Sequence, residues 1–288
     1  MLRFQSILRQ KASESATALW IIEKDYALSY LLAGISQVPN LRNALVLKGG
    51  TALKKTYYKD YRFSEDLDFS MLDNQEIDPI REGIEHAIEK MKEILLEKGA
   101  FRVHLTPLEL QKPHPRGQIA YIIRVQFPYH REPLCRLKVE ITTDEVVLLP
   151  PETRKVLHDY GEGFSADIQV YQLAEIIAEK YRALLQSLDR LREKGWGANR
   201  VCRDYYDLWW ILGHADINAS IIRTLTTQKC ALRKVSFTHP DEFFDDALIE
   251  VAFKEWDKLL SPFIPEKISL NKVLEELRAF TGSVWNES

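Results

Sequence analysis

The chain has 288 residues, 45% hydrophobic and 28% charged, so it can bury the cores of one large or two ordinary domains and is not a disordered protein. The formal net charge of −3 excludes a strongly basic protein of the kind that coats nucleic acid. The three cysteines are scattered and form no CxxC pair, so the sequence suggests neither a zinc site nor a disulfide framework.

The start of the chain gives no targeting signal. The first twenty residues contain no continuous apolar core of the kind found in signal peptides. The apolar segment 19–35 is interrupted by Glu23, Lys24 and Asp25, so it does not read as a membrane span. We therefore expect a cytoplasmic protein with no membrane partner.

Apolar periodicity and turn residues predict alternating elements in the first half of the chain. Asp78 is the expected N-cap of the last of these elements, Gly99 ends it, and Thr51 is the expected cap of the short helix before it. The expected elements are a helix over 14–35, a strand over 44–47, a short helix over 51–58, a strand over 65–70 and a helix over 78–98.

The predicted elements change from residue 101 onwards. Three strand-like runs, separated by short linkers, predict an antiparallel meander at 101–110, 120–127 and 134–143. The Pro- and Gly-rich segment 148–163 is the expected boundary. The runs beyond it read as helices, at 170–192, 203–213, 217–227, 241–260 and 268–280. The sequence thus predicts an α+β fold, with a mixed or antiparallel sheet in a domain at 1–150 and a helical domain at 151–288.

The segment 45–70, LVLKGGTALKKTYYKDYRFSEDLDFS, carries the most informative pattern. Gly49 and Gly50 follow an apolar strand, and glycines let a backbone approach a ligand closely. The helix expected after them directs its N–H groups at that point, which suits a phosphate, and Lys54 or Lys55 is placed to reach one. A double glycine alone is usually only a turn.

Asp66 and Asp68 complete the pattern. Residues two apart on a strand share a face about 6–7 Å apart, and neighbouring carboxylates repel unless a cation joins them. Mg²⁺ commonly takes one or two carboxylates together with substrate phosphates. A lone Asp-x-Asp is commonly a strand end, but after the glycine turn it predicts a loop for a triphosphate and a carboxylate pair for its metal.

The sequences LKGGTALKK and RFSEDLDF together resemble the signature of the nucleotidyltransferase AbiEii/AbiGii toxin family, in the DNA polymerase beta-like nucleotidyltransferase superfamily. IEKDYALSYLL resembles the family's N-terminal helix. The resemblance is close over 21–70, looser over 134–212 and not seen over 213–288. It implies a nucleotidyltransferase fold and Mg²⁺-dependent transfer of a nucleoside monophosphate from an NTP to an acceptor, which is tRNA for some members. It also implies a toxin with a cognate antitoxin protein.

The resemblance also implies roles for individual residues. Asp66 and Asp68 would be catalytic and hold the metal. The residues that would bind the nucleotide are Gly49, Gly50, Thr51, Lys54 and Ser64. A third acid is expected on a later strand, where RLKVEITTDE offers Glu140 as a metal ligand and Asp144 as the fallback. An ordinary exposed strand glutamate is an equal reading of Glu140.

The helical half carries a second match to the family. Lys180, followed by RDYYDLWW at 203–210, would place a lysine at the phosphates and Asp204 as an acid near it, with Asp207 as the competing match. Asp207 also suits a helix-dipole role. Lys180 interrupts an apolar helical stripe, so its amine is expected either in a cleft, at phosphates or Asp204, or in water with its stem on apolar neighbours.

Two other functions remain open from the sequence. One is kinase-like phosphoryl transfer at the same site, and the other is a non-catalytic nucleotide-binding module. Residues 102–138 and 178–203 each hold seven lysines and arginines, against two and three acids respectively. These basic segments are either solvated faces or the binding surface for a polyanionic substrate such as RNA.

Overall fold

The computed structural model describes residues 3–72, 76–108, 118–198 and 200–285. The contacts within the chain divide it into two compact units, Met1–Tyr171 and Gln172–Ser288, and each is described by itself. In the described ranges, every helix is too short or too polar to cross a bilayer.

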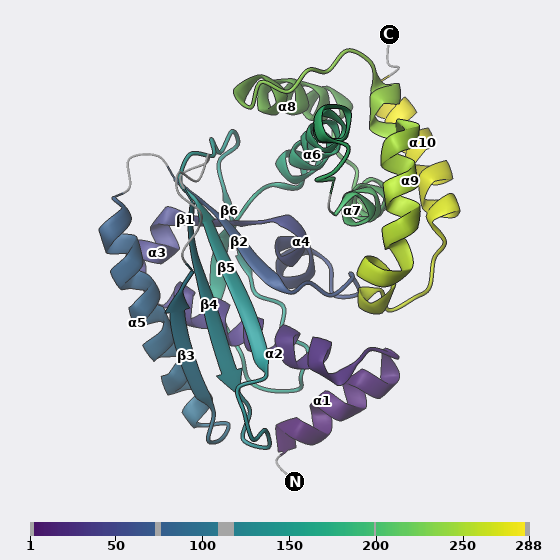
Figure 1. The fold of residues 1–288 in the computed structure, drawn as a ribbon. Coiled ribbons are helices and arrows are strands. Elements are labelled where there is room, and N and C mark those ends of the chain that lie inside the picture. The colour runs from purple at the N-terminus through teal and green to yellow at the C-terminus, as the bar shows by residue number, and fades with distance from the viewer. Residues whose placement is uncertain (1–2, 73–75, 109–117, 199, 286–288) are drawn as a thin grey trace. The chain divides into compact units, whose positions relative to one another are not determined.

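The first unit is built around a seven-stranded sheet with the order β3-β4-β5-β2-β1-β7-β6 (Figure 1). Its strands are β1 (Leu45–Lys48), β2 (Asp66–Met71), β3 (Arg102–Pro107), β4 (Gln118–Gln126), β5 (Cys135–Thr142), β6 (Glu152–Lys155) and β7 (Asp167–Val170). Its helices are α1 (Arg3–Glu14), α2 (Leu19–Ser36), α3 (Pro39–Ala44), α4 (Gly49–Ala52), the π-helical turn η1 (Leu53–Tyr57) and α5 (Ile77–Leu96).

The sheet is mixed, as the sequence predicts. Strands β3, β4 and β5 form the expected antiparallel meander, although the end of the first strand run at 109–110 lies outside the described residues. Strand β2 pairs parallel with β5 and antiparallel with β1, and β1 pairs parallel with β7. Strands β6 and β7 were not expected, because they are short and lie in or next to the Pro- and Gly-rich segment. They extend the first compact unit to Tyr171, beyond the boundary expected at 150.

Buried and more exposed side chains alternate along β5, so one face of the sheet packs into the core. Cys135, Leu137, Val139 and Ile141 are buried on one face, where α2 packs, and the intervening side chains point to the other face. Helix α2 is buried on nearly all sides, so it is a core helix that begins at Leu19, not the amphipathic helix expected from residue 14. Helix α1 was not predicted, although Phe4, Ile7 and Leu8 are spaced as on one face of a helix.

Two expected caps are wrong. Helix α4 begins at Gly49, with extended Lys48 as its N-cap, so Thr51 lies inside the first turn. Gly49 makes this early start possible because its φ of +72° suits a residue without a Cβ. Helix α5 begins at Ile77 after Glu76, which leaves Asp78 in its first turn and not at the cap.

The second unit is helical, as the sequence predicts. Its elements are α6 (Leu173–Lys194), α7 (Val201–His214), α8 (Ala219–Leu232), η2 (Pro240–Phe244), α9 (Asp246–Glu255), η3 (Trp256–Leu260), η4 (Ser261–Phe263) and α10 (Leu270–Trp285). The single helix expected over 241–260 is divided, because the Asp245 side chain accepts a hydrogen bond from Ala247 N and starts a new helix there.

Candidate active site

The glycine turn and the second aspartate of the Asp-x-Asp pair lie against each other. A Cβ placed on Gly49 would lie 3.3 Å from Asp68 Oδ2, so a larger residue would press on that carboxylate. Gly50 is even more confined, since a Cβ there would lie 2.5 Å from the guanidinium of the buried Arg62. The two glycines therefore bring the backbone close to a carboxylate on one side and a cation on the other.

Thr51 connects the glycine turn to the start of β2. Its hydroxyl donates to the Asp66 carbonyl oxygen and lies 2.8 Å from Ser64 Oγ. Thr51 is buried, whereas Ser64 is partly exposed. Thr51 and Ser64 are both predicted nucleotide-binding residues. Their contacts link the glycine turn to the start of β2, the strand that carries Asp66 and Asp68.

The register of the sheet places lysines beside the aspartates. Asp66 is opposite Lys138 of β5, while Asp68 lies between Lys48 of β1 and Glu140 of β5. Register partners on adjacent strands point to the same face of a sheet. The face thus brings three carboxylates together beside two lysines, and neighbouring carboxylates favour a cation between them.

Glu140 occupies the position expected for a third acid, but its side chain has other partners. Gln118 Nε2 donates to Oε1 at 2.8 Å, and Lys138 Nζ lies 2.9 Å from Oε2. Among the described residues, no three His, Cys, Asp or Glu side chains come together as a metal site. Asp66 and Asp68 alone fit Mg²⁺, because phosphate oxygens and water commonly supply its other ligands. A metal-binding role for Glu140 stays a prediction.

Lys54 and Lys55, in the π-helical turn η1 that follows the glycines, are buried and have polar partners. Lys55 Nζ lies 2.6 Å from Asp25 Oδ2 and 3.0 Å from Ser29 Oγ. Lys54 Nζ donates to the Lys59 carbonyl at 2.6 Å, and burial lowers the pKa of Lys54 to about 8. Lys55 therefore fixes η1 to α2, while nucleotide binding by Lys54 stays a prediction.

Lys180 lies between two aspartates within the second unit. Its amine is 2.7 Å from Asp204 Oδ1 and 2.8 Å from Asp207 Oδ2. Burial raises the pKa of Asp204, and the Lys180 charge opposes that rise. Asp207 is fully buried, and Asp204, not Asp207, is the acid of the first helical turn. The structure thus brings together both acids that the sequence offered as alternatives.

Three consecutive residues of α2 contact three segments that carry or adjoin the candidate site. Glu23 Oε1 accepts from Tyr129 OH at 2.7 Å, in the turn between β4 and β5. Lys24 Nζ lies 2.8 Å from Glu65 Oε1, immediately before Asp66, and Asp25 binds Lys55 of η1. This turn of α2, defined by residues 23–25, thus contacts η1, the residue before β2 and the turn between β4 and β5.

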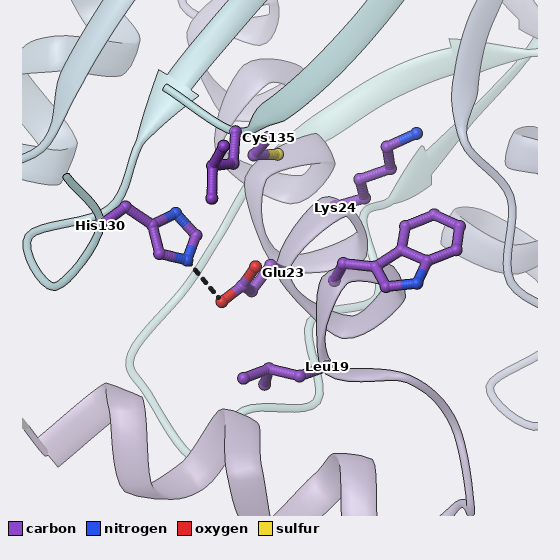
Figure 2. A pocket seen from close by; sticks show the side chains of 7 residues that line it. Leu19, Glu23, Lys24, His130 and Cys135 are labelled. Carbon is purple, nitrogen blue, oxygen red and sulfur yellow. Dashed lines mark ion pairs between the residues drawn. The ribbon is translucent and has the colours of Figure 1, made fainter. Parts of the chain in front are cut away.

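A cavity of about 310 Å³ lies next to this turn of α2 (Figure 2). Its lining residues are Leu19, Trp20, Glu23, Lys24, His130, Leu134 and Cys135. His130 Nε2 lies 3.2 Å from Glu23 Oε1, so the pair that anchors the β4–β5 turn also forms part of the cavity wall. Burial raises the pKa of the Cys135 thiol to about 12, which leaves it protonated and unreactive at neutral pH.

Arg62 and the α2 contacts were not identified from the sequence. Arg62 lies between Tyr61 and Phe63, four residues before Asp66. An arginine between two aromatic residues is the sequence signal that could have identified it. The Asp25–Lys55 pair joins residues far apart in the chain, and no periodicity reports such a pair.

Comparison with known proteins supports the family resemblance seen in the sequence. The sequence profile of the nucleotidyl transferase AbiEii toxin family, type IV toxin–antitoxin system, matches residues 30–279. The match extends well beyond residue 212, so the absence of resemblance noted over 213–288 is corrected. A search of curated proteins found no match.

One solved structure is similar over nearly the whole chain. It is MenT4, a nucleotidyltransferase toxin from Mycobacterium tuberculosis H37Rv, with 21% identity and a TM-score of 0.56. The alignment covers 95% of this chain and 98% of that one, so the two share a fold. Together with the profile match, these observations show that the chain belongs to the nucleotidyl transferase AbiEii toxin family and is a nucleotidyltransferase.

Proposed function

We propose that this protein uses an NTP and Mg²⁺ to transfer a nucleoside monophosphate to an RNA acceptor, tRNA among the candidates. The observation that carries the proposal is the contact between the Gly49 turn and the Asp68 carboxylate. That contact puts a backbone suited to phosphates beside side chains suited to the metal that accompanies them. As a family member, the toxin would be neutralised by a cognate antitoxin.

The residues of the chain would act as follows. The backbone of Gly49, Gly50 and Thr51 binds the triphosphate, and Asp66 and Asp68 hold Mg²⁺. When bound, Mg²⁺ supplies charge stabilisation for the phosphate oxygens. The acceptor hydroxyl oxygen forms a bond to the α-phosphorus while the bond to the bridging oxygen breaks. Pyrophosphate leaves, and the hydroxyl proton passes to water.

Isotope position tests the reaction. The protein is incubated with total RNA and each NTP in turn, labelled either on the α- or on the γ-phosphorus. Monophosphate transfer puts the α-label on RNA and the γ-label in pyrophosphate. Kinase-like transfer would put the γ-label on the product, and a non-catalytic module would leave both labels in the NTP. Either of the last two results contradicts the proposal.

Lys180→Met should lower turnover about tenfold or more, equivalent to about 1.4 kcal/mol, because it removes an amine proposed to contact the phosphates. It should also lower stability at neutral pH, since Asp204 and Asp207 lose the cation between them. The folded pKa of Asp204 is already raised, so its contribution is stabilising at low pH and is lost as pH rises through that pKa. The variant's deficit should therefore shrink on acidification.

The pH dependence of thermal unfolding, compared with that of wild type, measures this effect. Lys194→Met is the matched control, since Lys194 is exposed at the end of the same helix. A Lys180→Met protein with wild-type kinetics and a wild-type stability profile would contradict both roles.

A further inference from the structure

Basic side chains form a row across the three outer strands of the first unit. Arg136 of β5 is the register partner of Arg124 of β4, and Arg124 is the partner of His104 of β3. Arg102 lies two residues before His104 on the same strand and the same face. We call these four exposed residues the basic row. Since strands are 4.7–4.9 Å apart, it crosses about 10 Å of the sheet.

The basic row is on the face of the sheet that carries the candidate carboxylates. Along β5, Arg136, Lys138 and Glu140 alternate with buried residues and therefore share one face. Lys138 is the register partner of Asp66, and Arg136 precedes Lys138 by about 7 Å of strand. The strands that carry the row lie side by side, leading from β2 to the edge of the sheet (Figure 1).

The basic row does not stabilise the sheet. Like charges directly opposite each other on paired strands are destabilising, and Arg124 faces Arg136 in this way. In the part of the chain that the structure describes, no carboxylate forms an ion pair with Arg102, Arg124 or Arg136. Lys138, by contrast, has Glu140 at 2.9 Å. A polyanion bound along the row would supply the missing negative charge.

We propose that the basic row binds the backbone phosphates of the nucleic-acid acceptor and leads its reactive hydroxyl to Asp66 and Asp68. This inference rests on the proposed function. The row leads from the candidate carboxylates towards the edge strand β3, as an extended phosphate chain would. The glycine turn, in contrast, is the site proposed above for the triphosphate of the NTP. An acidic protein could also neutralise the row, but it would not have to deliver a reactive hydroxyl to Asp66 and Asp68, as a nucleic-acid acceptor must.

The test compares two charge-matched double variants of the full chain. Arg124→Gln with Arg136→Gln removes the centre of the row. Arg42→Gln with Arg81→Gln removes two exposed arginines from α3 and α5, away from the row. The probe is a fluorescent single-stranded RNA of mixed sequence, and binding is measured by anisotropy over a range of KCl concentrations.

The row variant should bind the RNA about tenfold more weakly than wild type. The slope of log affinity against log salt should fall in magnitude by about 1.4, because each phosphate contact on a single strand contributes about 0.7. The control variant should match wild type in both. The row variant should also unfold at the wild-type temperature or above it, since a repulsive cross-strand pair has been removed.

Binding of NTP, measured in parallel, distinguishes the two sources of phosphate. Unchanged NTP affinity with weakened RNA binding supports the inference. Weakened NTP binding with unchanged RNA binding would assign the row to the triphosphate and overturn it. Unchanged RNA affinity and salt slope would also overturn it, and this is the result expected if the row serves an acidic protein.

The failure of this inference differs from the failure of the proposed function. If wild type transfers no α-label to RNA, the proposed function fails. If wild type transfers label while the row variant binds RNA as wild type does, only the acceptor surface has been placed wrongly.

Discussion

Asp68→Asn is expected to lower nucleoside monophosphate transfer by about 1000-fold or more while the protein remains folded. Asparagine keeps the shape of the side chain but removes the charge that holds Mg²⁺, and the several kcal/mol supplied by a metal correspond to such a factor. Asp68 is partly exposed at the sheet face, so a neutral isostere leaves the packing intact. Asp66→Asn should behave similarly. The measurement is transfer of α-label to RNA with Mg²⁺ present.

The control for this experiment is Asp167→Asn, at an exposed position of β7 in the same sheet. It should retain wild-type transfer. In cells, overproduced wild type should slow growth, and Asp68→Asn should relieve the effect. Near-normal transfer by either the Asp66 or the Asp68 variant would show that the metal is held elsewhere.

Lys55→Met should destabilise the first unit by about 3–5 kcal/mol, because it leaves a buried carboxylate without its cation. Lys55 and Asp25 have side chains only 2% and 4% exposed, and their charged atoms are 2.6 Å apart. Asp25 Oδ1 has no hydrogen-bond partner among the described residues, so the carboxylate depends on the contacts of Oδ2. The midpoint of thermal unfolding should fall by about 10 °C.

Two further variants separate charge from packing. Lys59→Met removes a lysine that is 62% exposed and 3.3 Å from Asp159, so it should change stability by well under 1 kcal/mol. Asp25→Asn with Lys55→Met removes both buried charges and should recover much of the loss. A double variant as unstable as Lys55→Met alone would show that packing of the lysine stem, not the buried charge, is responsible.

The local parts of the candidate site were predictable from the sequence. The glycine turn and the Asp66–Asp68 pair lie within one short segment, and a period of two places both carboxylates on one face. Register partners were not predictable in this way. The lysines beside Asp66 and Asp68 come from strands whose alignment depends on the whole sheet.

The sequence did not predict the long-range polar contacts or the short strands β6 and β7, for different physical reasons. A pair such as Asp25–Lys55 follows no periodicity, and burial of charge runs against the usual expectation for those residue types. Strands β6 and β7 have four residues each and follow or flank prolines and glycines, so turn signals outweighed them. For Lys180 the stripe showed an unusual position, but its acidic partner came only from the family resemblance.

The pairing of β1 with β7 determines when the first unit can be completed during synthesis. Leu47 pairs with Val170, and Tyr171 N donates to Leu47 O, so the strand that leads into the glycine turn acquires its second neighbour from the end of the unit. Such contacts close a long loop and form slowly compared with local ones. A ribosome-bound chain can form the meander early, but the strand that supports Gly49 stays open on one edge until Tyr171 has emerged. The sheet of the first unit can therefore be completed only after all of its candidate site residues have been synthesised.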